Sequence, residues 1–276
     1  MYPKNEVQVD QEKKRSCRKY IMLSLMEKVL EDMELWDNEE KEQEITFYRR
    51  TASLLDVLFK NTDVMLTDGE TASYSSKTAL EMNKCIFGNA DSPITTTYPR
   101  KIDLLLKYDR DERVELSSNE WKRACISPSI ALSQQINNLK VNATIINKNQ
   151  SVYSSTFNQS LAIDFVGLTG YGYILEKLND VFFAKTICLL ILPKDFDTFS
   201  AFKNTLNFFF TLKEFYCQKT IELKEIVSTR RALSRISSIV NVSCEEDASA
   251  KTNLIFFKQS RKRKRPDSKD EDEEAA

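Results

Sequence analysis

The stretch of residues 98–140 constrains the fold more than any other part of the chain. It contains a short apolar run at 102–106, a charged turn at 109–113 and a second run that ends at 122. Two such runs joined by a short polar turn predict a pair of neighbouring strands. Ser127 and the proline that follows it predict the start of a helix, because proline fits the first helical turn. This strand–turn–strand–helix order favours an α/β fold.

The rest of the chain agrees with this fold class. Apolar runs and alternation predict further strands at 161–166, 173–178 and 181–192, and a period of 3.6 predicts helices at 11–36, 45–59, 71–84, 198–219 and 222–240. We therefore expect a mixed central sheet of about five strands with flanking helices. The expected domains are a loose leader (1–10), a helical pair packed on the core (11–64), an α/β domain (65–240) and a disordered tail (241–276).

Three expectations concern how these elements pack. Residues 68–70 contain an Asp-Gly pair and predict a turn, which would place Glu70 near the N-terminus of the following helix. The nearly unbroken apolar run at 181–192 predicts a strand that is covered on both faces. In the helix after Ser127, the spacing of the apolar residues predicts that they face the sheet. The apolar positions are Ile130, Ile136, Leu139 and Ala143; Gln135, Asn138 and Asn142 then fall on another face.

The chain has no histidine among its 276 residues. This absence excludes a Ser-His-Asp or Cys-His nucleophilic site, a histidine proton shuttle and any zinc site with a histidine ligand. Hydrolytic chemistry in this chain would therefore depend on carboxylates, lysine and a hard divalent cation.

The net charge, the cysteines and the hydropathy of the chain exclude further classes of protein. The net charge of −1 gives no overall attraction for nucleic acid, so any such attraction must come from local patches. No two of the six cysteines have CxxC spacing, which argues against a zinc ribbon or a redox motif. The N-terminus does not resemble a signal peptide, and no apolar stretch has the length of a membrane span. We expect an intracellular protein with reduced thiols and no contact with a membrane.

Three residues of the central stretch suggest chemistry. Asp103 lies in the first predicted strand, and Glu120 and Lys122 lie two residues apart in the second, so they share one face of it. Two acids on adjacent strands can share a divalent cation such as Mg²⁺ or Mn²⁺. A lysine beside them can orient water or stabilise the transition state of phosphodiester hydrolysis.

This arrangement resembles the PD-(D/E)XK nuclease superfamily. The residues that carry the resemblance are Lys101 to Leu106 around the first acid and Asn119 to Lys122 for the E-x-K motif. The resemblance implies that Asp103 and Glu120 bind the metal and that Lys122 is catalytic. It further implies supporting roles for a glutamate on a preceding helix, which Glu70 could match, and for a polar residue on the following helix, which Gln134, Gln135 or Lys140 could match. A block at about 66–215 is also similar to uncharacterised proteins of mucoralean fungi, which bring no activity with them.

The resemblance is not complete. Pro99 lies four residues before Asp103 and not directly before it. A second register pairs Asp103 with Glu115, but the residue two positions after Glu115 is Ser117 and not lysine. By parity, Glu115 would face away from Glu120 unless a bulge lies between them. The sequence leaves both registers open.

The C-terminal region carries a separate signal. Five consecutive cations, Arg261, Lys262, Arg263, Lys264 and Arg265, precede Pro266 in a stretch that cannot bury a core. Such a run is typical of a nuclear import signal that importin recognises, and it can also contact phosphates. The acids that follow at 270–274 would weaken nonspecific DNA binding, which favours the import interpretation and a nuclear location.

The sequence thus supports three hypotheses of different classes. The first is metal-dependent phosphodiester hydrolysis of nucleic acid in the nucleus. The second is a catalytically inactive nuclease-like scaffold that acts as a nuclear nucleic-acid-binding or protein-binding module. The third is an adaptor that binds other proteins through its helical pair. Metal-dependent cleavage separates the first hypothesis from the other two.

Overall fold

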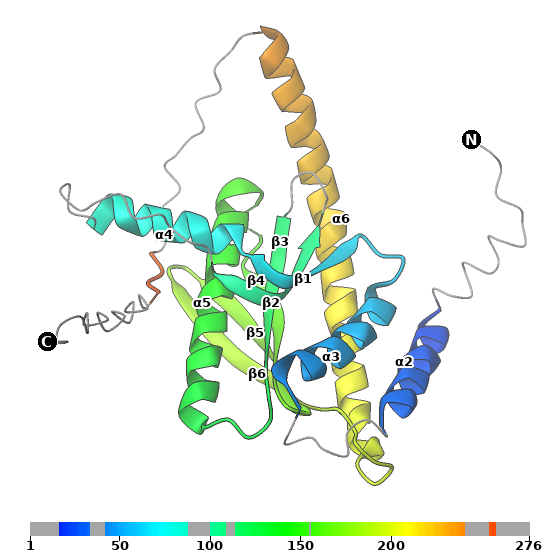
Figure 1. The fold of residues 1–276 in the computed structure, drawn as a ribbon. Coiled ribbons are helices and arrows are strands. Elements are labelled where there is room, and N and C mark those ends of the chain that lie inside the picture. The colour runs from blue at the N-terminus through cyan, green and yellow to red at the C-terminus, as the bar shows by residue number, and fades with distance from the viewer. Residues whose placement is uncertain are drawn as a thin grey trace, which may run out of the picture.

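The computed structural model describes residues 17–33, 42–87, 100–108, 114–154, 156–240 and 254–257. Within these ranges the fold is α/β, with a mixed six-stranded sheet between helices (Figure 1). In chain order the elements are α2 (Arg18–Met33), α3 (Glu44–Phe59), β1 (Val64–Ala72), α4 (Tyr74–Phe87), β2 (Lys101–Tyr108), β3 (Val114–Lys122), α5 (Pro128–Val152), β4 (Gln159–Val166), β5 (Thr169–Leu178), β6 (Val181–Ile191), a 3₁₀ turn (Phe199–Ala201) and α6 (Phe202–Val240). The predicted fold class is confirmed.

The strands lie in the sheet in their chain order, from β1 at one edge to β6 at the other. Among the described strands, β3 and β4 run parallel, and the other neighbouring pairs are antiparallel. Parallel neighbours need a crossover connection, and α5 supplies it by packing on one face of the sheet. Helices α3 and α6 cover the opposite face, and the last turns of α6 project beyond it (Figure 1).

The main core lies between the sheet and the α3–α6 layer. Trp121 of β3 is fully buried there, with its ring stacked 6.1 Å from Phe165 of β4 and edge-on at 5.2 Å to Tyr48 of α3. Close packing is visible at Gly172 of β5, where a Cβ atom would come within 2.4 Å of the Phe208 ring of α6. This tight contact holds α6 against β5 and β6.

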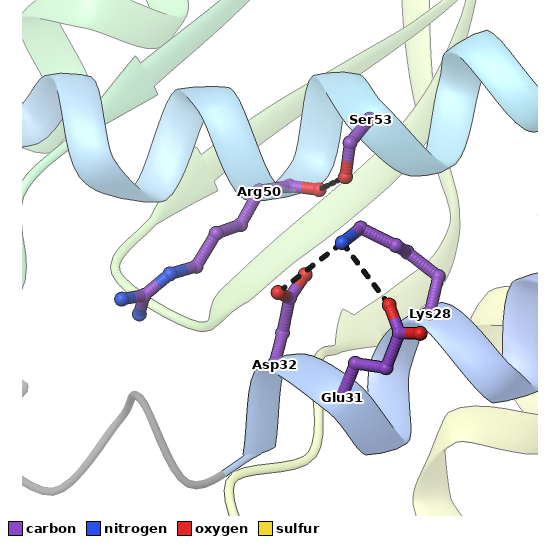
Figure 2. A network of polar contacts seen from close by, with 5 residues as sticks. All are labelled: Lys28, Glu31, Asp32, Arg50 and Ser53. Carbon is purple, nitrogen blue, oxygen red and sulfur yellow. Dashed lines mark hydrogen bonds and ion pairs between the residues drawn. The ribbon is translucent and has the colours of Figure 1, made fainter.

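The N-terminal helices α2 and α3 pack as the expected pair. Their apolar faces are buried against each other, and several polar residues of both helices lie beside this contact (Figure 2). Lys28 of α2 places its ammonium 3.4 Å from Glu31 and 3.6 Å from Asp32, and Ser53 of α3 donates a 2.7 Å hydrogen bond to the Arg50 carbonyl. Ion pairs as exposed as Lys28–Glu31 contribute little to stability, so the apolar contacts hold this pair together.

Two packing predictions were wrong. Residues 68–70 do not form a simple turn, because they belong to β1, which pairs with β2 and has a register shift between Asp68 and Thr71. Glu70 therefore lies in a strand, and α4 starts four residues later. The run at 181–192 forms β6, an edge strand that is largely exposed, with Phe183 at 53% and Leu189 at 61%. Helix α6 packs on only part of this strand, so several of its apolar side chains stay exposed.

The tail predicted to be disordered lies mostly outside the described residues, as does the leader at 1–10. Within the tail, Leu254–Phe257 is described, and it lies against α4 and α5. Phe257 packs against a buried cluster from β2 and α5, and the Ile255 carbonyl accepts a 2.8 Å hydrogen bond from the side chain of Asn83. Among the described helices, none is both long enough and apolar enough to pass through a membrane.

A candidate acidic site

The pairing of β2 with β3 decides which acids meet. Leu104 pairs with Asn119, so the next position places Asp103 opposite Glu120 on one face of the sheet. The two carboxyl groups share a side-chain hydrogen bond. Asp103 also accepts a 2.8 Å hydrogen bond from the Trp121 backbone N–H. The structure therefore brings together the two acids that the sequence predicted as metal ligands.

A third acid, Asp164, lies beside this pair. The parallel register of β3 and β4 places Asp164 directly next to Glu120, and only 1% of Asp164 is exposed. Its carboxylate accepts hydrogen bonds from Asn138 at 2.5 Å and from the Tyr171 hydroxyl at 3.0 Å. The sequence analysis missed this residue. A signal was present, because Asp164 is a single acid within an apolar strand, as Asp103 is.

Lys122 lies at the edge of the acidic site and is already paired. Its ammonium group is 2.8 Å from Glu44, the first residue of α3, and donates a 2.7 Å hydrogen bond to the Trp121 carbonyl. Both side chains are partly exposed, at 26% and 41%. The positive charge of Lys122 lowers the pKa values of Asp103 and Glu120, so it acts on both acids.

Burial makes these acids hold protons at unusually high pH. Burial, and then the charge of Asp103, raises the pKa of Glu120 to about 8. Burial likewise raises the pKa of Asp164 to about 7, against the opposing effect of its hydrogen bonds from Asn138 and Tyr171. The pKa of Asp103 is also raised by burial, although the hydrogen bond from Trp121 opposes the shift. Near neutral pH the Asp103–Glu120 pair therefore shares a proton, which a bound cation could replace.

Helix α5 covers this site with its polar face. Asn138 accepts a 2.6 Å hydrogen bond from Ser118 of β3 and donates to Asp164, while Asn142 donates and accepts 2.9 Å hydrogen bonds with the Ser118 backbone. The apolar residues predicted to face the sheet do not all do so, because Ile130 is 51% exposed and Ile136 is 44% exposed. The helix packs through buried amides and not through an apolar stripe at this end.

Gln134, and not Gln135, faces the sheet. Gln134 is 7% exposed and lies one helical turn before Asn138 on the same face of α5. Neither the oxygen nor the nitrogen of its side-chain amide has a hydrogen-bond partner among the described residues. Because α5 runs antiparallel to β3, this turn lies toward the Glu120 end of the strand. The supporting role that the resemblance implied for Gln135 therefore fits Gln134 better.

Glu115 does not belong to the acidic site. A register shift between Leu106 and Lys107 turns its side chain toward α4, at the opposite end of β3 from Glu120. The buried carboxylate accepts hydrogen bonds from the Ser73 hydroxyl at 3.1 Å and from the backbone N–H groups of Tyr74 and Ser75 at 2.7 and 3.0 Å. It thus caps the N-terminus of α4, and the register that paired it with Asp103 is wrong.

Changing Glu115 to alanine should therefore destabilise the protein without removing a member of the acidic site. Loss of a buried helix cap that satisfies two backbone donors should lower the free energy of unfolding by about 1–3 kcal/mol. Urea unfolding followed by circular dichroism measures the change. The control is Glu81→Ala, an exposed acid on α4, which should have little effect. Equal stabilities of the two variants would show that the cap contributes nothing.

The other predicted site residue, Glu70, lies in β1 between Asp68 and Thr71, where the register shifts. The structure does not describe the position of its side chain. Within the described residues, no group of three or more histidine, cysteine, aspartate or glutamate side chains is arranged to hold a metal ion.

Comparison with protein-family models, curated proteins and solved structures finds no match to this chain.

Proposed function

We propose that the protein hydrolyses phosphodiester bonds of nucleic acid with the help of a divalent cation at Asp103 and Glu120. The observation that carries this proposal is the pair of carboxyl groups that share a hydrogen bond beside the ammonium group of Lys122. Two acids placed together in a buried setting are costly unless a positive species joins them. The order α4, β2, β3, α5 also agrees with the helix–strand–strand–helix order that the resemblance implies.

The chemistry of the donor set fits Mg²⁺ or Mn²⁺ better than a softer metal. Mg²⁺ keeps several waters and binds through one or two carboxylates together with substrate phosphates, so it does not need a third acidic ligand. Asp103 and Glu120 would hold it, whereas both oxygens of Asp164 already accept hydrogen bonds from the protein. When bound, such an ion supplies Lewis acidity and an acidified water.

The residues of the chain would divide the remaining work. The Trp121 N–H fixes the carboxylate of Asp103, and Asn138 and Tyr171 hold the side chain of Asp164 beside Glu120. Lys122 would orient water or stabilise the charge that develops on the phosphate. To do so, its ammonium would exchange its contact with Glu44 for a contact with the phosphate.

The test is cleavage by the purified protein. We expect it to nick or degrade DNA or RNA in the presence of Mg²⁺ or Mn²⁺, and EDTA should stop the reaction. Single-stranded and double-stranded substrates of both kinds should be tried. If none is cleaved with either metal, the hydrolase proposal is wrong.

One observation favours a second candidate, a nuclease-like scaffold that binds without cleaving. The charge of Lys122 is neutralised by Glu44, its ammonium also donates to the Trp121 carbonyl, and the acids hold a proton near neutral pH. A site in this state is stable without a cation. Nucleic acid binding that falls steeply with salt, in a protein that cleaves no substrate, would support this candidate.

We also propose that the protein is nuclear and that importin recognises residues 261–265, which lie outside the described part of the chain. Deletion of residues 261–276 should move a fluorescent fusion from the nucleus to the cytosol. The matched control deletes only residues 267–276, which keeps the basic run and removes the acids, and it should stay nuclear. Nuclear accumulation of the larger deletion would contradict the proposal.

A further inference from the structure

A pocket of about 310 Å³ lies between helices α4 and α5. The wall from α4 consists of positions 74, 75, 78, 79, 82 and 83, which recur at three and four and so share one face of the helix. Helix α5 contributes residues between 144 and 152, and the described part of the tail, at Leu254 and Ile255, closes one side (Figure 1). None of the residues placed in the acidic site lines this pocket, so a ligand bound here would be distinct from a substrate at the acids.

One end of the pocket carries a positive charge. The ammonium of Lys148 lies 3.5 Å from the centre of the Tyr74 ring, at the start of α4. Glu115 acts on Lys148 through its charge, but its carboxylate bonds to the start of α4. Among the described residues, no carboxylate forms an ion pair with this ammonium, and no acceptor takes a hydrogen bond from it. Its three N–H donors are therefore available to an anion in the pocket.

A buried hydroxyl group lies at the same end. Ser75 is 2% exposed, lines the pocket and follows Tyr74 in α4. Its backbone N–H donates to Glu115, whereas its hydroxyl oxygen has no hydrogen-bond partner in the part of the chain that the structure describes. A serine hydroxyl can rotate about χ1 and donate its proton to a nearby oxygen. Because a buried hydroxyl without a partner is unfavourable, a ligand oxygen at this end would stabilise it.

The other end of the pocket is apolar. Ala79 lies one turn and Met82 two turns beyond Ser75 along α4, which places Met82 about 10 Å from Ser75. Ile255 lines the same end, where its carbonyl accepts a 2.8 Å hydrogen bond from the Asn83 amide. A water molecule takes about 30 Å³ in the liquid, so the pocket has room for roughly ten non-hydrogen atoms. The pocket thus fits a short molecule with one anionic end and one apolar end.

We infer that this pocket binds a small monocarboxylate, with its carboxylate on Lys148 and Ser75 and its apolar body along Ala79 and Met82. A single ammonium balances a single negative charge, and the nearby carboxylate of Glu115 repels a second one, which argues against a phosphate. The inference does not depend on the proposed hydrolysis, because no acid of that site takes part.

Octanoate, a monocarboxylate of the expected size, is the probe. Its binding to the full chain is measured by isothermal titration calorimetry in EDTA, so that no divalent cation takes part, and we expect one site per chain. Lys148→Met keeps an unbranched side chain and removes the charge, so it should weaken octanoate binding at least about tenfold. The same variant should bind octanol, the neutral alcohol, nearly as the native protein does.

Ser75→Ala separates a role in binding from a role in folding. It should weaken octanoate binding about threefold, through the loss of one hydrogen bond. The same change should leave the thermal unfolding temperature of the ligand-free protein unchanged or higher, because a buried hydroxyl without a partner is removed. A serine that serves only the fold would instead lower the unfolding temperature and leave octanoate affinity as it is, which would contradict the inference.

Two further variants complete the test. Ala79→Phe should fill the pocket and abolish the binding of both octanoate and octanol. The matched control is Lys77→Met, which removes a lysine charge from α4 outside the pocket and should bind octanoate as the native protein does. The inference is overturned if octanoate does not bind, or if Lys148→Met binds it as tightly as the native protein. Octanol or octyl phosphate binding as tight as that of octanoate would overturn it as well.

Discussion

Replacing Asp103 with asparagine is expected to abolish metal-dependent cleavage while the protein stays folded. The amide oxygen can still accept the hydrogen bond from the Trp121 N–H, which is 2.8 Å long in the native protein. The negative charge that would hold a divalent cation is lost, and neutral amides are weak ligands for Mg²⁺ compared with carboxylates. Initial cleavage rates at saturating Mg²⁺ measure the effect, and circular dichroism confirms the fold. Cleavage at the native rate would remove Asp103 from the site.

Lys122 and its partner Glu44 supply the matched pair for this experiment. Lys122→Ala should lower the cleavage rate by about 10²–10³-fold if its charge acts at the transition state. Glu44→Gln removes the 2.8 Å ion pair and should leave the rate unchanged or raise it, because the ammonium is then released toward the substrate. A purely structural ion pair would instead make both variants less stable and equally slow.

Local patterns in the sequence predicted that Asp103 would meet an acid of the next strand and favoured Glu120, but they left Glu115 open as the alternative. The two runs that form β2 and β3 are short and joined by a charged turn, so their pairing is local in the chain. Side chains alternate across a strand, and Glu120 and Lys122 therefore share a face. The rival register failed because Glu115 pairs with Lys107, at the far end of β2 from Asp103, and its carboxylate there caps α4.

Asp164 could not be placed in the site by such local reasoning. It lies 44 residues after Glu120, and only the α5 crossover, which makes β4 a parallel neighbour of β3, brings the two together. The same crossover explains the error in α5. Its buried face is built from amides that match Ser118 and Asp164, and hydrophobic periodicity does not detect a helix that packs through hydrogen bonds.

The edge strand β6 shows the limit of reading burial from composition. An apolar run predicts cover on both faces, yet Thr205 of α6 bonds to the backbone of Ile191 at one end of β6, and Phe183 remains exposed nearer the other end. Which strand ends at an edge is decided by the order of the whole sheet. The edge carries Lys185 and a register shift near Ile187, which are features that protect exposed strands from pairing.

The stability of the protein should fall as the pH rises from about 5 to 8, and Glu120 is the main reason. Its pKa is raised from 4.5 to about 8 in the folded protein, so in this window the folded state holds a proton that the unfolded state has lost. The stability that the protonated Glu120 contributes is therefore fully present below its unfolded pKa of 4.5. It is lost as the pH rises toward the folded pKa of about 8, by at most about 1.4 kcal/mol per pH unit. Asp164 adds to the loss between 3.8 and about 7.

Glu120→Gln should remove most of this slope between pH 7 and 8, since an amide keeps the hydrogen bond to Asp103 without a proton to lose. Urea unfolding at several pH values measures the slope, and the exposed acid Glu81, changed to glutamine, is the control that should retain it. Mg²⁺ should stabilise the native protein more at pH 8 than at pH 6, because the cation competes with the shared proton. A variant that keeps the full slope above pH 7 would show that Glu120 does not hold that proton. Equal stabilisation by Mg²⁺ at both pH values would place the cation elsewhere.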